Sequence, residues 1–422
     1  MPKIKPFQGL RPVSNLAEKV ASPPYDVLSS QEARELTKDN PYSFLHISKP
    51  EIDLPIGKNQ YDEEVYKKGA ENLKKFKNEK ILIQDKESCF YIYRLIMGEH
   101  TQSGIVSSAS IADYNNGKIK IHEYTRPDKE KDRTTHIDIL SANTGPVFLT
   151  YHANESINKI INIIQKLEPI YNFTSNDGIK HTIWRIDNAR IIEKIQSEFN
   201  DLDYLYISDG HHRSAAAARV QEIRKRKNPN HTGDEEYNYF LAVIFPDNQM
   251  YIMDYNRVVK DLNGFSKSVF LNKVSEKFNI EKHNKTYPSK DEQLQVDKPT
   301  DKHTFRMYLN NCWYKLRAKY DTYNENDPVD SLDVSILHKN LMEPILGISD
   351  PRKDKRINFV GGIRGLKELE RLVDSGKYAV AFALYPTSIK ELMNVADSNK
   401  VMPPKSTWFE PKLRSGLLIH LI

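Results

Sequence analysis

Cysteine is scarce in this chain: Cys89 and Cys312 are the only two among 422 residues. They lie far apart, each in apolar or aromatic surroundings, which predicts reduced structural thiols rather than a disulfide framework. Paired cysteines that could form a zinc ribbon or finger do not occur. We therefore expect any metal to be a hard ion held by oxygen ligands and phosphate.

Long apolar runs are also missing. No stretch approaches the roughly 20 apolar residues that a membrane-spanning helix needs. Residues 1–6 carry positive charges but no apolar region follows them, so we expect no secretory signal, no membrane contact and a cytoplasmic location. The mean hydropathy of −0.64 is typical of a soluble protein with a heavily charged surface.

Neither sign of charge dominates, since the chain has 62 basic and 57 acidic residues and a net charge of +5. This balance does not call for a nucleic-acid partner. The densest basic run, 224–227, follows an expected helix, where cations at the carboxyl end are favourable in their own right. A Walker-type phosphate loop is absent, and the glycine-rich run 361–365 is more typical of a turn.

Apolar spacing predicts a mixed fold of the α+β type with mainly antiparallel sheets. We expect helices at 61–76, 157–167 and 366–373, a helix capped at Ser29, paired strands at 90–97 and 104–111, and hairpins around 176–178 and 246–249. The charged stretch 287–303 is expected to be a surface excursion. The resulting division is a helical segment at 1–85 packing on the core, a catalytic core at 86–262 and an α/β domain at 263–422.

The most informative run is Tyr204-Leu205-Tyr206-Ile207-Ser208-Asp209-Gly210-His211-His212-Arg213-Ser214-Ala215. Its apolar start predicts a buried strand, Asp209-Gly210 a turn, and the small residues from Ser214 a tightly packed helix. A strand, a turn and a helix N-terminus form an anion site, because free backbone N–H groups and the helix dipole face one point. Imidazole and guanidinium donors suit phosphate oxygens, and Asp209 could take a proton or hold a metal ion. These residues therefore predict a site for a phosphorylated ligand.

Two further runs hold candidate residues. His122 and Glu123 end a short strand, where Glu123 could act as a general base if the fold brings it to the histidine pair. The charges that follow, including Lys129 and Arg133, alternate in sign as on a solvated helix. Tyr25 and Asp26 follow two prolines that hold the chain extended, so this corner either presents them rigidly or only packs.

These motifs resemble those of a known family. A His-Glu pair followed by Asp-Gly-His-His-Arg looks like the free L-serine kinases, whose catalytic domain is related to ParB and sulfiredoxin. Over nearly its whole length the chain is identified as a member of a bacterial family catalogued as domain of unknown function 1015. The matching stretches are 22–27, 122–126, 209–213 and 402–409, which read SPPYDV, HEYTR, DGHHR and MPPKSTWF.

The resemblance implies a ParB/sulfiredoxin-like core that transfers a phosphoryl group from ATP or ADP to the hydroxyl of free L-serine. By this analogy Glu123 is the base, and Asp209 assists through the hydroxyl or through Mg²⁺. The phosphates are held by the run 210–214, namely Gly210, His211, His212, Arg213 and Ser214. The chain departs from compact kinases by an insertion between Glu123 and Asp209 and by long flanking segments.

Because of those additions, the resemblance does not say which residues bind the amino-acid substrate. The candidates are His122, Thr125, Arg126, Lys405, Ser406 and Thr407, with Lys412 and Arg414 nearby in the sequence. A basic, hydroxyl-bearing loop at 405–407 suits a carboxylate or a phosphate, although the run could equally be an aromatic packing corner around Trp408. Small-molecule substrate and nucleotide are the expected partners, and an oligomer is possible.

Two other functions compete with a kinase. A ParB-like nucleotide switch predicts a recognition helix and a basic face, and neither stands out in the sequence. A metal-dependent phosphohydrolase could use His122, Glu123, Asp209, His211 and His212 as nitrogen and oxygen ligands. The hydrolase would bind a transition metal and release phosphate without an acceptor.

Overall fold

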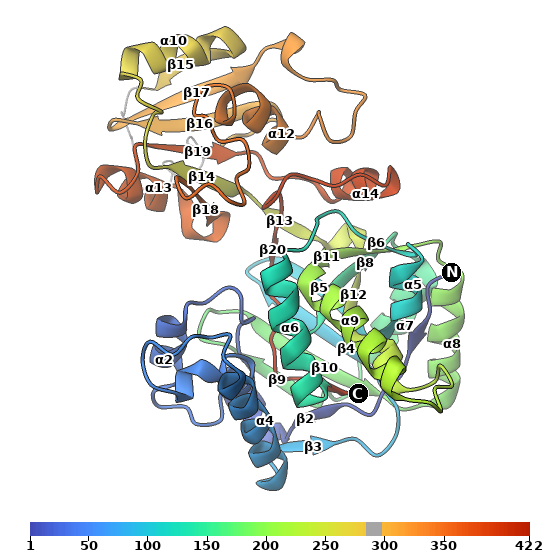
Figure 1. The fold of residues 1–422 in the computed structure, drawn as a ribbon. Coiled ribbons are helices and arrows are strands. Elements are labelled where there is room, and N and C mark those ends of the chain that lie inside the picture. The colour runs from blue at the N-terminus through green and yellow to red at the C-terminus, as the bar shows by residue number, and fades with distance from the viewer. Residues whose placement is uncertain (284–297) are drawn as a thin grey trace. The chain divides into compact units, whose positions relative to one another are not determined.

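The computed structural model describes residues 1–283 and 298–422, and the chain divides into two compact units. The first comprises 1–250 together with 411–422, and the second comprises 251–410 (Figure 1). The segment 1–85, expected to pack on the core, lies within the first unit. The three-part division stays a prediction. Most of the expected surface excursion at 287–303 lies outside the described residues.

A nine-stranded sheet forms the centre of the first unit. Its order is β6-β11-β8-β12-β5-β4-β10-β9, with β1 added beside β5. Neighbouring strands run antiparallel except for the parallel pairs β6–β11 and β8–β12. The strands are β1 (Ile4–Lys5), β4 (Phe90–Met97), β5 (His100–Ser110), β6 (Ile119–Lys120), β8 (Val147–Tyr151), β9 (Tyr171–Thr174), β10 (Lys180–Ile186), β11 (Leu205–Asp209) and β12 (Tyr239–Pro246).

Burial on both faces explains the composition of the central strands. In β12 seven consecutive residues from Phe240 to Pro246 are buried, and all five of β8 are. Such continuous apolar runs are typical of strands covered on both sides. One of those sides carries α9 (His211–Lys227), whose alanines permit close packing and which also lies against α6 (Pro127–Leu140). The remaining larger helices of this region are α7 (Glu155–Ile164) and α8 (Ala189–Asn200).

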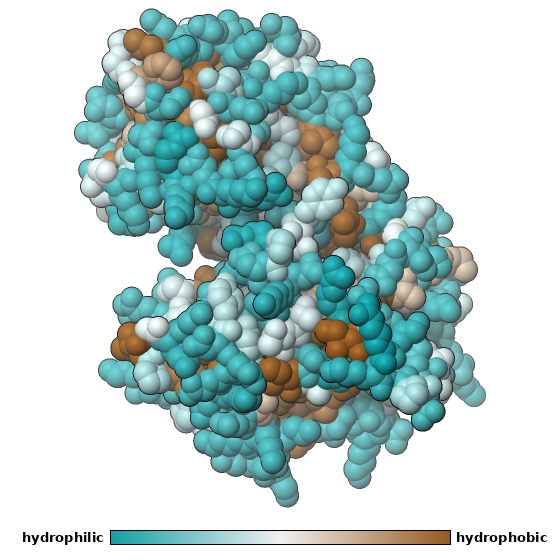
Figure 2. All heavy atoms as spheres, in the orientation of Figure 1, coloured by the Kyte–Doolittle hydropathy of each residue, from teal (hydrophilic) through white to brown (hydrophobic). Residues whose placement is uncertain are grey.

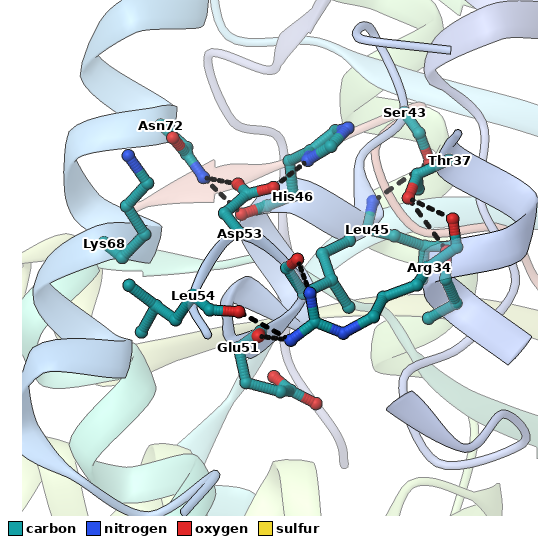
Figure 3. A network of polar contacts seen from close by, with 12 residues as sticks. Arg34, Thr37, Ser43, Leu45, His46, Glu51, Asp53, Leu54, Lys68 and Asn72 are labelled. Atoms are coloured by element: carbon teal, nitrogen blue, oxygen red, sulfur yellow. Dashed lines mark hydrogen bonds and ion pairs between the residues drawn. The ribbon is translucent and has the colours of Figure 1, made fainter. Parts of the chain in front are cut away.

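Hydrogen bonds tie the helices of the N-terminal segment together (Figure 3). The predicted capping box begins α2 (Ser30–Thr37), because Ser29 and Glu32 each bond the other's backbone N–H. Arg34 of this helix donates to the backbone carbonyls of Ile52, Glu51 and Leu54. The predicted helix at 61–76 is α4 (Glu63–Asn78). Asn72 of α4 donates to Asp53, which also bonds His46 of α3 (Leu45–Ser48).

The second unit contains a six-stranded antiparallel sheet in the order β15-β17-β16-β19-β14-β18. The strands are β14 (Tyr255–Val259), β15 (Phe278–His283), β16 (Thr304–Leu309), β17 (Cys312–Ala318), β18 (Ile357–Gly361) and β19 (Val380–Leu384). Its helices include α10 (Lys267–Lys277), α13 (Gly365–Asp374) and α14 (Ile389–Asp397). Leucines at 366, 369 and 372 of α13 are buried, as their helical spacing predicts.

One predicted hairpin is wrong. We expected 239–245 and 250–255 to pair across the turn at 246–249, but β13 (Tyr251–Met253) pairs with β20 (Trp408–Glu410). The physical reason is that β12 lies between β5 and β8, so both of its hydrogen-bonding edges are already used. The other hairpin, β9–β10 around 176–178, is confirmed.

The structure confirms the predicted fold class, a mixture of helices and mainly antiparallel sheets. Neither Cys89 nor Cys312 forms a disulfide in the described part of the chain, and burial raises the pKa of Cys89 to about 11. Within the described ranges no helix has both the length and the apolar character to cross a membrane. Hydrophilic side chains cover most of the face in Figure 2, in keeping with a chain that is 28% charged.

Candidate functional site

Parallel pairing of β6 with β11 assembles the candidate site. Ile119 pairs with Leu205, and Lys120 pairs with Tyr206. Because parallel strands end at the same edge of a sheet, the residues that follow them come together. His122 and Glu123 thus lie beside the start of α9, where His211 begins the helix. The fold brings the two motifs together although they are separated by more than 80 residues.

Gly210 makes the turn between β11 and α9. Its φ of +105° lies in the region that favours glycine. A side chain here would also be crowded, because a Cβ atom would lie 3.2 Å from Cζ of Arg213 and 3.3 Å from Cα of Val147. The tight turn directs the first backbone N–H groups of the 17-residue helix α9 toward the end of the strand. This is the arrangement in which helix N-termini bind anions.

Two buried histidines lie at the centre of the site. His122 and His211 are 2% and 7% exposed, and their rings meet edge to face with centroids 4.5 Å apart. The backbone N–H of His122 donates to Nε2 of His211 at 3.4 Å. Burial lowers the pKa of His122 to about 4, against opposing effects of the Ile207 backbone and Asp209. Burial and the neighbouring His122 also lower the pKa of His211, so both rings are neutral at pH 7.

Glu123 joins these histidines. One carboxylate oxygen of Glu123 and one ring nitrogen of each histidine all lie within 4.8 Å of one another. Glu123 is only partly buried, whereas both imidazoles are buried. A carboxylate so placed could accept a proton from a bound hydroxyl or bind a cation.

Two cations hold Asp209. Its Oδ2 lies 3.3 Å from Nζ of Lys412 and 3.6 Å from Nη2 of Arg213. Burial acts to raise the pKa of Asp209, but Lys412 and Arg213 outweigh it and hold the pKa well below its usual value. Asp209 is therefore ionised at every pH at which the protein is expected to work.

The residues of the first turn of α9 point in different directions. Arg213 is 9% exposed and turns into the protein, where it donates to the backbone carbonyl of Pro146. His212 accepts a hydrogen bond at Nε2 from the backbone N–H of Arg126, at 3.0 Å. The hydroxyl of Ser214 donates to the carbonyl of His211 at 3.0 Å. Phosphate binding by 210–214 stays a prediction. The guanidinium of Arg213 is buried beside Asp209 rather than exposed where a phosphate could meet it.

Only part of the stretch after Glu123 lies at the candidate site. Thr125 donates to Glu130 at 2.7 Å, and Arg126 pairs with Asp128 at 2.9 Å. Through its backbone, Arg126 lies next to His212 and so next to the site. Lys129 instead donates to the hydroxyl of Tyr61 at 3.0 Å.

The charged run that was expected to form a solvated helix belongs to α6. At the centre of this helix Asp132 and Arg133 are buried rather than solvated. Arg133 pairs with its neighbour Asp132 at 2.8 Å, and its guanidinium lies 3.9 Å from the ring centre of Tyr25. Burial raises the pKa of Tyr25, with Arg133 and Arg213 acting against it. Asp26 is exposed. A small cavity of about 20 Å³ is lined by Tyr25, Ser48, Arg133, Asn143, Arg213 and Ser415, among others.

The candidates near the carboxyl end divide between the units. Lys412 contacts Asp209, whereas Arg414 binds Asp177 and donates to Ser175 at 3.1 Å. The run 405–407 belongs to the second unit. There the carbonyl of Lys405 accepts from Arg257, and the carbonyl of Ser406 accepts from Thr387. Thr407 directly precedes β20.

Sequence reasoning missed the segment that holds Arg213. Pro146 supplies a backbone carbonyl, and Gly145 lies with Arg213 and Ser415 around one cavity. A backbone acceptor leaves no signal in side-chain chemistry. The Gly145-Pro146 pair before β8 is the only local feature that could have drawn attention to it.

Comparison with known proteins identifies the family. Residues 4–335 match the family described as "Protein of unknown function (DUF1015)", and the chain belongs to that family. No curated protein matches the chain.

Similar solved structures include a free serine kinase in complex with AMP, which is 11% identical over 75% of this chain and 91% of that one, at a TM-score of 0.34. SbnI with a C-terminal truncation, from Staphylococcus aureus, is 11% identical over 75% and 87%, at 0.38. A conserved hypothetical protein from Pyrococcus furiosus is 13% identical over 75% and 95%, at 0.34.

Proposed function

We propose that this protein is a nucleotide-dependent small-molecule kinase that phosphorylates the hydroxyl of free L-serine to give O-phospho-L-serine. The observation that supports it most is the parallel pairing of β6 with β11, which sets Glu123 beside the N-terminus of α9. A carboxylate and a helix N-terminus, the two parts that this proposal needs, thus lie at one sheet edge. Phosphoryl transfer needs positioning and charge neutralisation more than covalent chemistry.

The proposed reaction uses ATP or ADP as donor. The serine oxygen forms a bond to the terminal phosphorus while the bond from that phosphorus to the bridging oxygen breaks, and the shortened nucleotide leaves. Glu123 takes the hydroxyl proton. The backbone N–H groups at the start of α9 and the ring N–H groups of His211 and His212 donate hydrogen bonds to the phosphate oxygens.

We expect Asp209 to assist the transfer by contacting Mg²⁺ rather than by taking the proton. Mg²⁺ prefers carboxylate and phosphate oxygens, and when bound it would offset the negative charge of the nucleotide. Asp209, with Lys412 and Arg213 beside it, would offer a carboxylate oxygen to that Mg²⁺. Because Lys412 and Arg213 keep the group ionised, Asp209 does not compete with Glu123 for the proton.

The experiment is to incubate the purified chain with Mg²⁺, L-serine and either ATP or ADP, and to follow O-phospho-L-serine by phosphorus NMR. Glu123→Gln should reduce transfer by at least about a hundredfold while nucleotide binding is retained, since it removes only the base. Asp209→Asn should also lower transfer. Glu222→Gln, on the exposed face of α9, is the matched control and should act like the wild type.

Other outcomes point to other functions. Nucleotide hydrolysis at the same rate with and without L-serine would favour a phosphohydrolase. Nucleotide binding without turnover would favour a ParB-like switch. Transfer to D-serine, L-threonine or glycerate in preference to L-serine would keep the kinase but change its acceptor.

A further inference from the structure

We propose that His122, Glu123 and His211 together form a binding site for one divalent transition metal of the zinc class. The site shares Glu123 and His211 with the proposed kinase, but its test is separate because metal binding can be measured without turnover. It also differs from the expected Mg²⁺ contact at Asp209, which would use oxygen ligands alone.

The geometry of the three side chains suits a small cation. Their ligand atoms all lie within 4.8 Å of one another, and the two imidazole rings meet edge to face. Ligand atoms about 2.1 Å from a tetrahedral zinc ion lie about 3.4 Å apart. Rotations that move each atom by about 1 Å would therefore close the site.

The hydrogen bonding of His122 is that of a metal ligand. Nδ1 of His122 is buried and has no hydrogen bond within the described part of the chain, and the Ile207 backbone acts on the same ring. When Nε2 carries the proton and faces that backbone, Nδ1 is the free acceptor. The tautomer that results places an unshared electron pair on Nδ1 of a side chain only 2% exposed. Metal-binding histidines commonly donate their second nitrogen to a backbone carbonyl in this way.

A buried acceptor without a partner is unfavourable, so the electron pair on Nδ1 calls for a ligand. The elements that carry the three side chains are fixed. His122 and Glu123 follow a strand paired with β11, and His211 starts a helix of 17 residues. Ligands on such elements lose little freedom when a metal binds.

The donor set selects the class of metal. Two imidazoles and one carboxylate suit Zn²⁺, Co²⁺, Fe²⁺ or Mn²⁺, whereas Mg²⁺ takes oxygen ligands. Three protein ligands leave a coordination position for water or for an oxygen of a bound molecule. Within the described residues, this is the cluster whose histidine and carboxylate atoms come close enough to share an ion.

The test uses the full-length chain without a histidine tag, stripped of metal by a chelator. Titration with Co²⁺ should give one equivalent bound, with the visible d–d bands of a four- or five-coordinate ion, and Zn²⁺ should displace it. His122→Ala and His211→Ala should each weaken binding at least about tenfold. Glu123→Gln, which keeps the size of the side chain, should also weaken it.

The control is His152→Ala, which removes an exposed imidazole paired with Asp247 outside the cluster and should leave binding unchanged. Circular dichroism checks that each variant is folded. Binding of less than one equivalent, or equal affinity in His122→Ala, Glu123→Gln and the wild type, would overturn the metal site. Serine phosphorylation by a protein that binds no Co²⁺ would overturn only this site, whereas bound Co²⁺ without phosphorylation would count only against the kinase.

Discussion

At the scale of single residues, Lys412 helps to keep Asp209 ionised. It contributes to the low pKa of Asp209, which burial alone would raise. In Lys412→Met only Arg213 remains beside Oδ2, so the pKa of Asp209 should rise. If Asp209 acts in its ionised form, the acid limb of the pH–rate profile moves to higher pH and kcat/KM falls about tenfold to a hundredfold.

The measurement is the pH dependence of serine phosphorylation in the two proteins. Lys400→Met, which breaks an ion pair with Asp327 in the second unit, is the control and should keep the wild-type profile. An acid limb that stays in place in Lys412→Met would show that this ammonium group does not set the charge of Asp209.

Gly210 is the second residue whose replacement is informative. Gly210→Ala should cost about 1–2 kcal/mol for the backbone conformation and about 1 kcal/mol or more for the contacts with Arg213 and Val147. Gly178→Ala has a similar backbone cost, with φ at +79° and no atom within 4 Å of the added Cβ. Urea unfolding of both variants measures the difference, and equal losses would mean that the turn relaxes around the new methyl group.

At this scale the sequence indicated that both motifs follow strands, but not that they meet or how their side chains point. The apolar strand before Asp209 and the alternating strand before His122 were enough to predict that both motifs lie at strand ends. Nothing local predicts that Arg213 turns inward to Pro146, because its partner is a backbone carbonyl. Nor does the sequence show that Lys412 contacts a carboxylate 203 residues away.

At the scale of elements, a buried histidine links two helices. Nε2 of His136 on α6 lies 3.0 Å from the carbonyl of Ile47 on α3. Burial, aided by Arg133, lowers the pKa of His136 to about 3, against about 6.5 in an unfolded chain. Between these values the unfolded state binds more protons, so stability falls as the pH falls from 6.5 toward 3.

The wild type should therefore lose about 2 kcal/mol more than His136→Gln between pH 7 and pH 5. Glutamine keeps an N–H group for Ile47 but does not titrate. Urea unfolding at both pH values provides the measurement, with His152→Gln as an exposed control. Parallel losses in wild type and His136→Gln would mean that His136 already takes up its proton in the folded protein.

Local patterns predicted most elements and one wrong pairing. The spacing around 176–178 identified the β9–β10 hairpin, because β9 has only one neighbour in the sheet. The same reasoning failed after β12, since partners from distant segments occupy both of its edges. A turn signal reports local geometry, whereas pairing depends on which edges the rest of the chain leaves open.

At the scale of the whole molecule, the chain returns to its first unit after completing the second. Residues 411–422 add β21 (His420–Leu421) beside β7 (Ala142–Asn143) and bury Leu417, Leu418 and Ile419. A chain ending at residue 410 loses these three side chains, at about 1.5–3 kcal/mol each. This loss is comparable with the whole stability of many domains.

We expect the truncated chain to lose the thermal transition of the first unit while that of the second remains. Differential scanning calorimetry of both lengths separates the two transitions. A truncated protein whose first unit melts at the wild-type temperature would show that this return segment is dispensable.

The return segment also sets an order of events during synthesis. Asp209 leaves the ribosome 203 residues before Lys412. While 251–410 are being made, the sheet edge at 142–143 has no β21 and Asp209 has no lysine. The charge pattern around Asp209 is complete only once Lys412 has been made, so a chain that stops before residue 412 carries Asp209 with Arg213 alone beside it.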